Sequence, residues 1–335
     1  MGLEYRFLTI SDLKHYSHDL KSDPERILQS GMDLYGNSIL DNPYSSGDGD
    51  KAVCIALQDG KIVGRFILLQ SVLNVAGLCV PIQTGGGILV SEQKRGLGIG
   101  SSMIRRVLNN KIYFGALYTR AAYDIVRKTE TMLEIPQFVR YRYHGIKKVL
   151  DLPILFRQII LNKRFQIKKL TIVPEWAGDM ATRKTHKYME MHNTAWLQWA
   201  LDHVATGGES DYQSFYAVYD KKNIPVGFFM TKVRHITKDG KPMIKANLIE
   251  WASADLNRLS EVDINILALK TYDEKVSRFW TISENVETGK NLKCYFFKRR
   301  GWFAMSVTKD SQYKDIGEVR LWRIRYGCCN TALVE

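Results

Sequence analysis

The stretch from Pro81 to Leu108 constrains the fold of this chain most strongly, because its pattern is that of a strand, a turn and a helix in immediate succession. The pattern predicts a strand over Val80–Val90. Three consecutive glycines, Gly85 to Gly87, lie inside it. Since glycine weakens strands, they indicate a bulge or a place where a ligand lies close to the backbone. Three further glycines (Gly96, Gly98 and Gly100) then open a helix whose apolar residues recur at helical spacing.

A helix that begins in glycines is suited to bind an anion, most naturally phosphate, because its first backbone N–H groups are unpaired and that end of its dipole is positive. A P-loop would need Lys and then Ser or Thr after the last glycine, but Gly100 is followed by Ser101 and Ser102. A Rossmann fingerprint lies in the first strand–helix turn, with an acidic residue ending the next strand. Here the turn comes late and the next predicted strand, 112–119, is followed by Arg120. Both departures argue against a nicotinamide enzyme.

Arg95 followed by Gly98-Ile99-Gly100-Ser101 matches an R/Q-x-x-G-x-G/A signature. The segment from Val90 to Leu108 thereby resembles the part of the Gcn5-related N-acetyltransferase (GNAT) superfamily that holds the coenzyme A pyrophosphate. The resemblance covers the first half of the chain and its motif is specific only at Arg95 to Ser101. It implies a set of cofactor-binding residues. The backbone at Ile88, Leu89 and Val90 would bind the pantetheine arm and polarise the thioester carbonyl, and the N–H groups of Gly96, Leu97, Gly98, Ile99, Gly100 and Ser101 would hold the pyrophosphate, with Arg95 adding positive charge.

Length and composition set the class of protein. The 335 residues suit two domains of ordinary size, and 45% hydrophobic with 25% charged residues is typical of a globular chain. The N-terminus lacks the regions of a signal peptide, and no stretch reaches the roughly twenty apolar residues that span a bilayer. We therefore expect a cytoplasmic protein without a transmembrane segment.

The net charge of +13 raises the question of a nucleic-acid partner. The basic residues are spread as short pairs, such as Arg105-Arg106 and Lys168-Lys169, and no nucleic-acid-binding motif accompanies them. Attraction of an anionic ligand such as coenzyme A explains the charge equally well. We do not expect nucleic acid as a partner.

The five cysteines show no C-x-x-C spacing, so buried thiols in a reducing compartment are the simplest interpretation. The adjacent pair Cys328-Cys329 is a candidate for redox or metal chemistry, and His15 and His18, one turn apart, are candidates for zinc binding. Because no third ligand type clusters near these histidines, and because free cysteine commonly behaves as a small hydrophobe, we predict no metal.

The rest of the first half is predicted from local signals. An Asp59-Gly60 turn between apolar runs, 52–57 and 61–69, indicates a β-hairpin. Helices are predicted over 13–20, with Ser11 as cap, and from Pro24 to about Leu34. Later elements are a strand over 112–119, a helix over 121–132 and a strand over 137–143. The apolar and basic stretch 152–170 indicates a linking helix that runs into a strand; a membrane-surface helix is the alternative.

The second half repeats this order. A helical pattern over 180–204 carries Trp196 and Trp199, which we expect in the core, and 212–220, 224–230 and 243–252 repeat the hairpin and central strand. Residues 291–302 resemble the closing pattern of the GNAT family, with a helix that carries Tyr295 and Phe297. We therefore predict an α+β fold of two GNAT-like domains, each with a mixed, mostly antiparallel sheet flanked by helices: residues 1–150, a linker over 151–170, and a degenerate second copy over 171–335. Because 253–261 contains no glycine, only the first copy is expected to bind coenzyme A.

The catalytic groups are less well marked. The resemblance implies direct attack of an amine on the thioester in a ternary complex, without an acyl-enzyme, and no G-x-S-x-G elbow contradicts this. Tyr123 is the candidate acid, although a packed helix aromatic fits equally well. Glu250, on the central strand of the second half, is the candidate base; its alternative is a salt-bridged strand residue.

The predicted function is N-acyl transfer from acetyl-CoA or another acyl-CoA to a small-molecule amine. Two alternatives remain open at this point. One is aminoacyl transfer from tRNA, which some tandem proteins of related fold perform and which would use the positive surface. The other is a binding or scaffolding protein that keeps the cofactor site but lacks a working acid and base.

Overall fold

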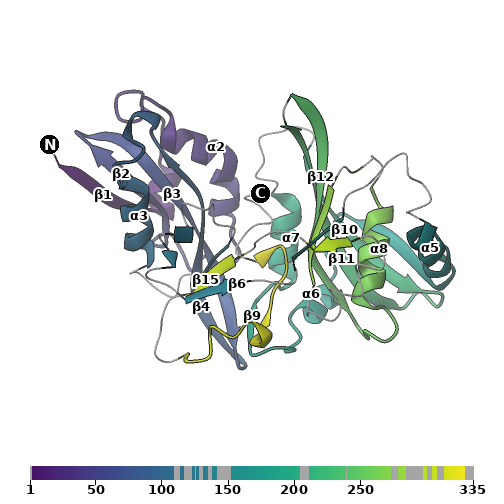
Figure 1. The fold of residues 1–335 in the computed structure, drawn as a ribbon. Coiled ribbons are helices and arrows are strands. Elements are labelled where there is room, and N and C mark those ends of the chain that lie inside the picture. The colour runs from purple at the N-terminus through teal and green to yellow at the C-terminus, as the bar shows by residue number, and fades with distance from the viewer. Residues whose placement is uncertain are drawn as a thin grey trace.

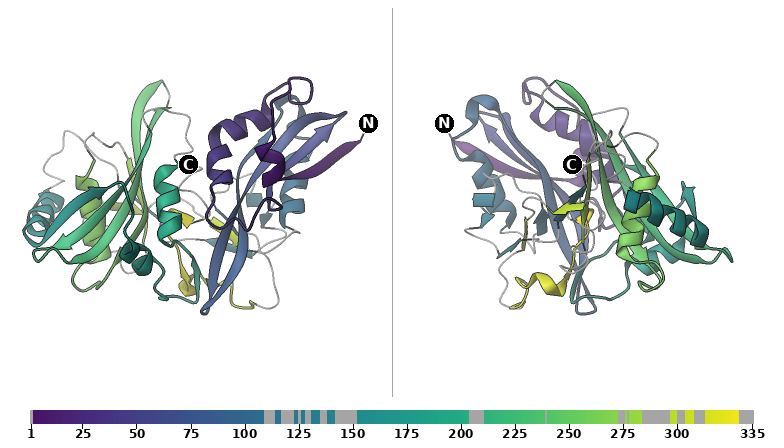
Figure 2. Two further views of the ribbon diagram at one scale, coloured as in Figure 1. Left: turned by 180° about the vertical axis from the view of Figure 1, so that it is seen from behind. Right: turned by 45° about the vertical axis from the view of Figure 1, so that its right-hand side comes forward.

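The computed structural model describes residues 2–108, 114–116, 123–124, 126–127, 131–134, 138–141, 152–203, 211–238, 240–272, 276, 278–283, 297–299, 304–307 and 313–328. Their strands form a sheet of six, a sheet of seven and a small sheet of three. The two larger sheets lie side by side, with α7 (Thr194–Asp202) between them (Figures 1 and 2). This mixed, mostly antiparallel α+β architecture is the predicted fold class. None of the described helices has both the length and the apolar character needed to cross a bilayer.

The six-stranded sheet is built on a long β-hairpin that is buried on both of its faces. Its first four strands pair antiparallel in chain order: β1 (Leu3–Thr9), β2 (Lys51–Gln58), β3 (Lys61–Val75) and β4 (Leu78–Val90). The predicted Asp59-Gly60 turn is confirmed, with both residues at positive φ. Alternate residues of β2 and β3 pack on opposite sides, against α2 (Ile27–Leu40) on one face and α3 (Ile99–Leu108) on the other. This burial explains why the hairpin is apolar at nearly every position. Strand β1 was not predicted.

The seven-stranded sheet carries helices on both faces as well. Helices α5 (Leu152–Arg164) and α8 (Glu261–Lys270) pack on one face, and α6 (Glu175–Ala181) and α7 on the other. Its order is β14 (Phe297–Arg299), β7 (Phe138–Tyr141), β13 (Arg278–Ile282), β12 (Lys241–Ser253), β11 (Pro225–Lys238), β10 (Tyr212–Asp220) and β8 (Phe165–Leu170). The predicted hairpin, central strand and helix-then-strand linker of the second half are confirmed.

The two halves of the chain exchange strands. Strand β7 of the first half lies in the seven-stranded sheet, while β9 (Tyr188–Glu190) and β16 (Trp322–Arg323) of the second half extend the six-stranded sheet. A strand of the second half, β15 (Ala304–Val307), lies between β5 (Phe114–Ala116) and β6 (Thr131–Glu134). A short 3₁₀ helix (Val319–Leu321) precedes β16. The domain boundaries at residues 150 and 170 stay a prediction.

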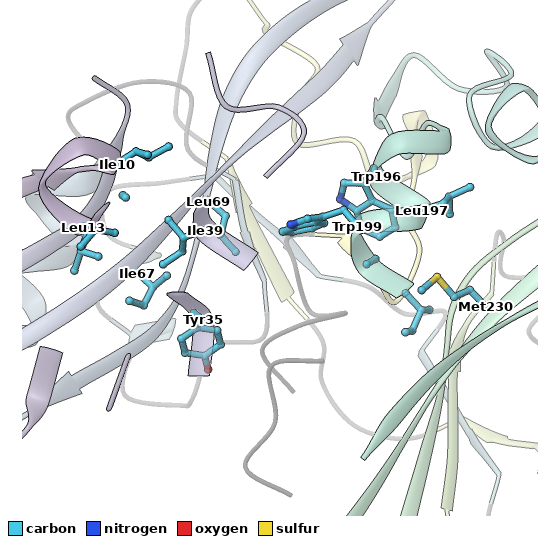
Figure 3. Packing of buried hydrophobic residues seen from close by; sticks show 14 of the residues in the cluster. Ile10, Leu13, Tyr35, Ile39, Ile67, Leu69, Trp196, Leu197, Trp199 and Met230 are labelled. Carbon is cyan, nitrogen blue, oxygen red and sulfur yellow. The ribbon is translucent and has the colours of Figure 1, made fainter. Parts of the chain in front are cut away.

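One hydrophobic core reaches from the first sheet to the second through α7. Trp199 points toward the side of Ile39 and Leu69, and Leu197 lies on the side of Met230 from β11 (Figure 3). The indole N–H of Trp199 donates to the carbonyl of Ser38 in α2 at 3.0 Å. The prediction that Trp196 and Trp199 belong to the core is confirmed, since their exposed fractions are 1% and 5%.

Several helices begin or end at residues other than those predicted. Capping side chains fix these ends, and hydrophobic periodicity does not reveal the caps. Helix α1 is Ile10–Lys14 only: Thr9, not Ser11, caps it, in a reciprocal box with Asp12. Helix α2 begins at Ile27 instead of Pro24, because the buried carboxylate of Asp23 accepts the N–H groups of the first turn of the helix, Ile27 to Gln29, at 2.6 to 3.0 Å.

Three predicted helical segments contain strands. The segment over 180–204 is divided among the end of α6, β9 and α7, because β9 pairs with β3 and Asn193 caps α7 by accepting from the backbone N–H of Trp196. Residues 131–132 belong to β6, and Phe297 to β14. Tyr295 lies outside the described residues.

Candidate functional site

The glycines of β4 form a bulge, as predicted. Strand β3 pairs Ile67 with Gly86 and Arg65 with Leu89, so that two residues of β4, Gly87 and Ile88, stand opposite one residue of β3. Gly87 has a φ of +56°. A Cβ on Gly87 would lie 2.9 Å from a ring carbon of Tyr35, so both the backbone conformation and the space require glycine. At a bulge the strand pairing is interrupted and backbone groups are left to other partners.

Arg65 holds this bulge in place. Its side chain is 4% exposed, its Nε donates to the carbonyl of Ile27 at 2.5 Å, and its Nη1 donates to the carbonyl of Gly87. Burial lowers the pKa of Arg65, and Tyr35 and Asp23 oppose that effect. The start of α2 and the bulge are thereby joined. Arg65 was not predicted as a site residue, although a charged side chain inside an apolar strand is a signal in the sequence.

The glycine turn between β4 and α3 is open. A 3₁₀ turn over Glu92–Lys94 leads into it, and Gly96 and Gly98 have φ angles of +85° and +79°. A Cβ built on either glycine would meet no described atom within 4 Å. The first turn of α3 contains no acidic residue, so no carboxylate of that turn competes for its N–H groups. The helix itself is as predicted, with its apolar face buried at Ile99, Met103, Ile104 and Val107.

The bulge and the start of α3 lie together. A Cβ on Gly100 would be 3.7 Å from the side chains of both Ile88 and Val90. Arg95 is exposed, donates through Nε to the carbonyl of Val90 at 3.4 Å, and lies 3.3 Å from the carboxylate of Glu92. Of the other predicted cofactor residues, Leu97 is exposed and Leu89 and Ser101 are half-buried. The structure thus brings the bulged strand, the glycine turn and one cation into a single region.

Tyr123, the candidate acid, lies in a helical turn and is half-buried. The guanidinium of Arg127 is 5.9 Å from the centre of its ring. Val126, three residues further along the chain, is fully buried. The catalytic role of Tyr123 stays a prediction.

Glu250, the candidate base, lies on β12 and belongs to a buried cluster of charged side chains. Its carboxylate accepts from Arg323 at 2.8 Å, from Arg325 at 3.2 Å and from Nδ1 of His192. Burial acts to raise the pKa of Glu250, but Arg323, His192 and Arg325 together lower it to about 2. This is the geometry of the salt-bridged alternative. A carboxylate held in this way has little affinity for a proton at neutral pH.

The charged cluster around Glu250 lies near the part of β4 around Ile82 and not near the bulge at Gly87 and Ile88. Ser71 on β3 donates to Glu190 at 2.6 Å, and Glu190 lies beside His192 in the cluster. Ser71 pairs with Ile82 of β4, which at a strand rise of about 3.3 Å per residue is roughly 20 Å along β4 from Ile88. By this strand register, Glu250 is not close to Ile88, Leu89 and Val90.

Comparisons with known proteins bear on the fold. No protein-family model matches the sequence, and no curated protein matches it. Solved structures do. The Saccharomyces cerevisiae N-myristoyltransferase with bound myristoyl-CoA superposes with a TM-score of 0.54 at 13% identity, over 91% of this chain and 82% of that one.

Two further structures agree. A conserved Enterococcus faecalis protein of unknown function, described as a probable N-acyltransferase, superposes with a TM-score of 0.56 at 10% identity, over 93% of this chain and 74% of that one. A GCN5-related N-acetyltransferase from Anabaena variabilis gives 0.53 at 13% identity, over 91% and 72%. The chain therefore has the fold of the N-acyltransferases of the GCN5-related and N-myristoyltransferase type.

Proposed function

We propose that this chain is an acyl-CoA-dependent N-acyltransferase that transfers an acetyl or other short acyl group to the amine of a small molecule. The observation that carries the proposal is the meeting of the β4 bulge with the open, glycine-built start of α3, where a Cβ added to Gly100 would lie 3.7 Å from the side chains of Ile88 and Val90. The fold supports it, because solved N-acyltransferases share that fold over most of their length.

Each part of the region has a role in this proposal. The N–H groups from Gly96 to Ser101, at the positive end of α3, bind the pyrophosphate, and Arg95 adds a positive charge. The backbone of Ile88 to Val90 lies along the pantetheine arm, and its donors polarise the thioester carbonyl where negative charge develops.

The reaction is a direct displacement. The amine nitrogen attacks the carbonyl carbon, a C–N bond forms, and the C–S bond breaks. The nitrogen loses a proton to solvent, and the departing thiolate gains one to give free coenzyme A. We assign the protonation of the departing thiolate to Tyr123. Glu250 is not assigned as the base, because its pKa is lowered to about 2 by Arg323, His192 and Arg325 against the effect of burial.

The experiment that tests the proposal measures thiol release. The purified chain is incubated with acetyl-CoA and with longer acyl-CoAs, each with a panel of small amines, and free coenzyme A is titrated with a thiol reagent. We expect release that depends on both substrates. Coenzyme A at 100 times its dissociation constant is expected to stabilise the fold by about 2.7 kcal/mol. Absence of thiol release with every pair, together with an unchanged melting temperature, would refute the proposal. Stabilisation by tRNA alone would favour aminoacyl transfer.

A further inference from the structure

A second group of functional side chains lies away from the proposed coenzyme A site, where three segments meet. Glu190 ends β9, His192 stands just before α7, and Cys328 follows β16. All three are buried, with exposed fractions of 1% to 2%. A carboxylate oxygen, a ring nitrogen and the sulfur of these residues lie within 4.8 Å of one another. In Figure 1 β9 and the yellow C-terminal segment run close together in the middle of the molecule, consistent with the pairing of β9 with β16.

The ring of His192 is fixed with one nitrogen directed at this group. Nδ1 contacts the carboxylate of Glu250, which in its ionised form can only accept, so Nδ1 carries the proton. The ring also stacks on Trp196, with centroids 3.7 Å apart and planes 11° from parallel. Nε2 is therefore the nitrogen that is directed at Glu190.

Nε2 is buried and has no hydrogen-bond partner among the described residues. Oε2 of Glu190 lies 3.8 Å from it, beyond hydrogen-bond distance. A ring nitrogen and a carboxylate thus face each other inside the protein. A positive charge between them, carried by a proton or by a metal ion, would stabilise this arrangement.

The other two members of the group are also held in place. Oε1 of Glu190 accepts from the hydroxyl of Ser71 at 2.6 Å, and the sulfur of Cys328 accepts from the backbone N–H of Arg325 at 3.3 Å. A ligating histidine whose second nitrogen donates to a carboxylate, as His192 does to Glu250, is the usual arrangement around protein-bound metals.

We infer that Glu190, His192 and Cys328 bind one divalent transition-metal ion, with zinc as the best match. Zinc accepts oxygen, nitrogen and sulfur donors, whereas calcium and magnesium take oxygen only. The charges also fit: Glu190 and a Cys328 thiolate offer two negative charges to the ion, while Glu250 is already paired with Arg323 and Arg325. Three protein ligands leave a fourth position for water.

The ion would act on the fold and not on the acyl group. Its ligands come from β9, from the start of α7 and from the C-terminal segment, so binding would tie these segments together at the junction of the two sheets. This group does not stand out in the sequence, because Glu190, His192 and Cys328 come from segments far apart in the chain and because the sequence neighbour of Cys328 is another cysteine.

The test uses the full chain, freed of metal and dialysed against Zn²⁺ alone. We expect one zinc per chain and a rise in melting temperature. With Co²⁺ in place of zinc, we expect a thiolate-to-cobalt charge-transfer band in the near ultraviolet. Absence of both zinc uptake and a melting shift in the folded wild-type chain would overturn the inference without any variant.

Variants then identify the ligands. Cys328→Ser is expected to abolish the cobalt band, and Glu190→Gln, which keeps the shape of the side chain, to weaken zinc binding at least tenfold. Cys54→Ser, an equally buried cysteine in β2, and Cys329→Ser, its neighbour in sequence, should keep the band. A band that survives Cys328→Ser, or that is lost with Cys329→Ser alone, would contradict the assignment.

Discussion

The central strands of the two halves, β4 and β12, are both bulged, but what lies at the bulge differs. In β4 the bulge at Gly87 and Ile88 faces the open glycine turn. In β12 the extra residue is Ile249, and the chain's own C-terminal segment covers it: the N–H of Gly327 donates to the carbonyl of Ile249 at 2.8 Å. A backbone segment of the chain thus lies against the second bulge. At the first bulge the Gly87 carbonyl accepts from the Arg65 side chain, and we propose that a cosubstrate lies along the strand there.

The helices that follow the two strands show the same contrast. Helix α8 begins with a capping box, in which the Ser260 hydroxyl accepts from the N–H of Asp263 and the Asp263 carboxylate accepts from Ser260. The loop before it is fixed by an ion pair of 2.6 Å between Arg258 and Asp220. Helix α3 begins in two left-handed glycines and has no acidic residue in its first turn. The N–H groups that side chains satisfy at the start of α8 are the counterparts of those that we propose bind the cosubstrate at the start of α3.

The largest effect is expected from Glu250→Gln. This change removes the counter-charge of Arg323 and Arg325 while leaving them buried, so we expect the free energy of unfolding to fall by about 3–5 kcal/mol. Urea denaturation measures it, with Glu92→Gln, an exposed carboxylate, as the control. A loss below about 1 kcal/mol would mean that the charges of β12 are not coupled as described.

Gly327→Ala tests whether the C-terminal segment closes the second bulge. An added Cβ would lie 2.6 Å from a methyl of Ile249 and 3.0 Å from its carbonyl oxygen, so we expect a loss of about 1–3 kcal/mol by overpacking. Coenzyme A affinity should not change. If the variant is as stable as the wild type, the contact between Gly327 and Ile249 is not a tight closure.

Gly98→Ala probes the open turn, and Gly60→Ala is its matched control. Both glycines have similar φ angles, +79° and +75°, and both have free space around the missing Cβ. The strain of about 1–2 kcal/mol should therefore be alike. Only Gly98→Ala is expected to weaken coenzyme A binding, by about tenfold or more, in isothermal titration. Equal coenzyme A affinities in the two variants would show that the glycine turn does not bind the cosubstrate.

The smallest effect is expected from Ser260→Ala. Loss of the cap of α8 should cost about 1 kcal/mol in thermal unfolding. Binding of coenzyme A and thiol release should be unchanged, since the second helix start serves the fold alone. A weakened affinity in this variant would show that the two helix starts are not separate in function.

Local signals predicted the elements that repeat but not the strand pairing that joins the halves. The Asp59-Gly60 hairpin and the glycine-opened helix α3 follow from turn chemistry and periodicity, which act over a few residues. Strand β7 was predicted as a strand, but its place in the second sheet depends on pairing with β13 and β14. Periodicity does not specify such long-range pairing.

The same reason applies to the buried polar groups. Arg65, fixed by Ile27 and Gly87, and the group of Glu190, His192 and Cys328 are each assembled from segments distant in sequence. The glycine turn could be predicted because all of its groups belong to one short segment. A site that forms where two sheets meet can be recognised only from the three-dimensional arrangement of the sheets.

Isothermal titration of the wild-type chain with coenzyme A tests the central claim most directly, because the claim is that one half of the molecule is open to this ligand and the other is closed. We predict one coenzyme A per chain, with binding weakened by Gly98→Ala and unaffected by Ser260→Ala. Absence of binding, or two equivalents per chain, would contradict the account.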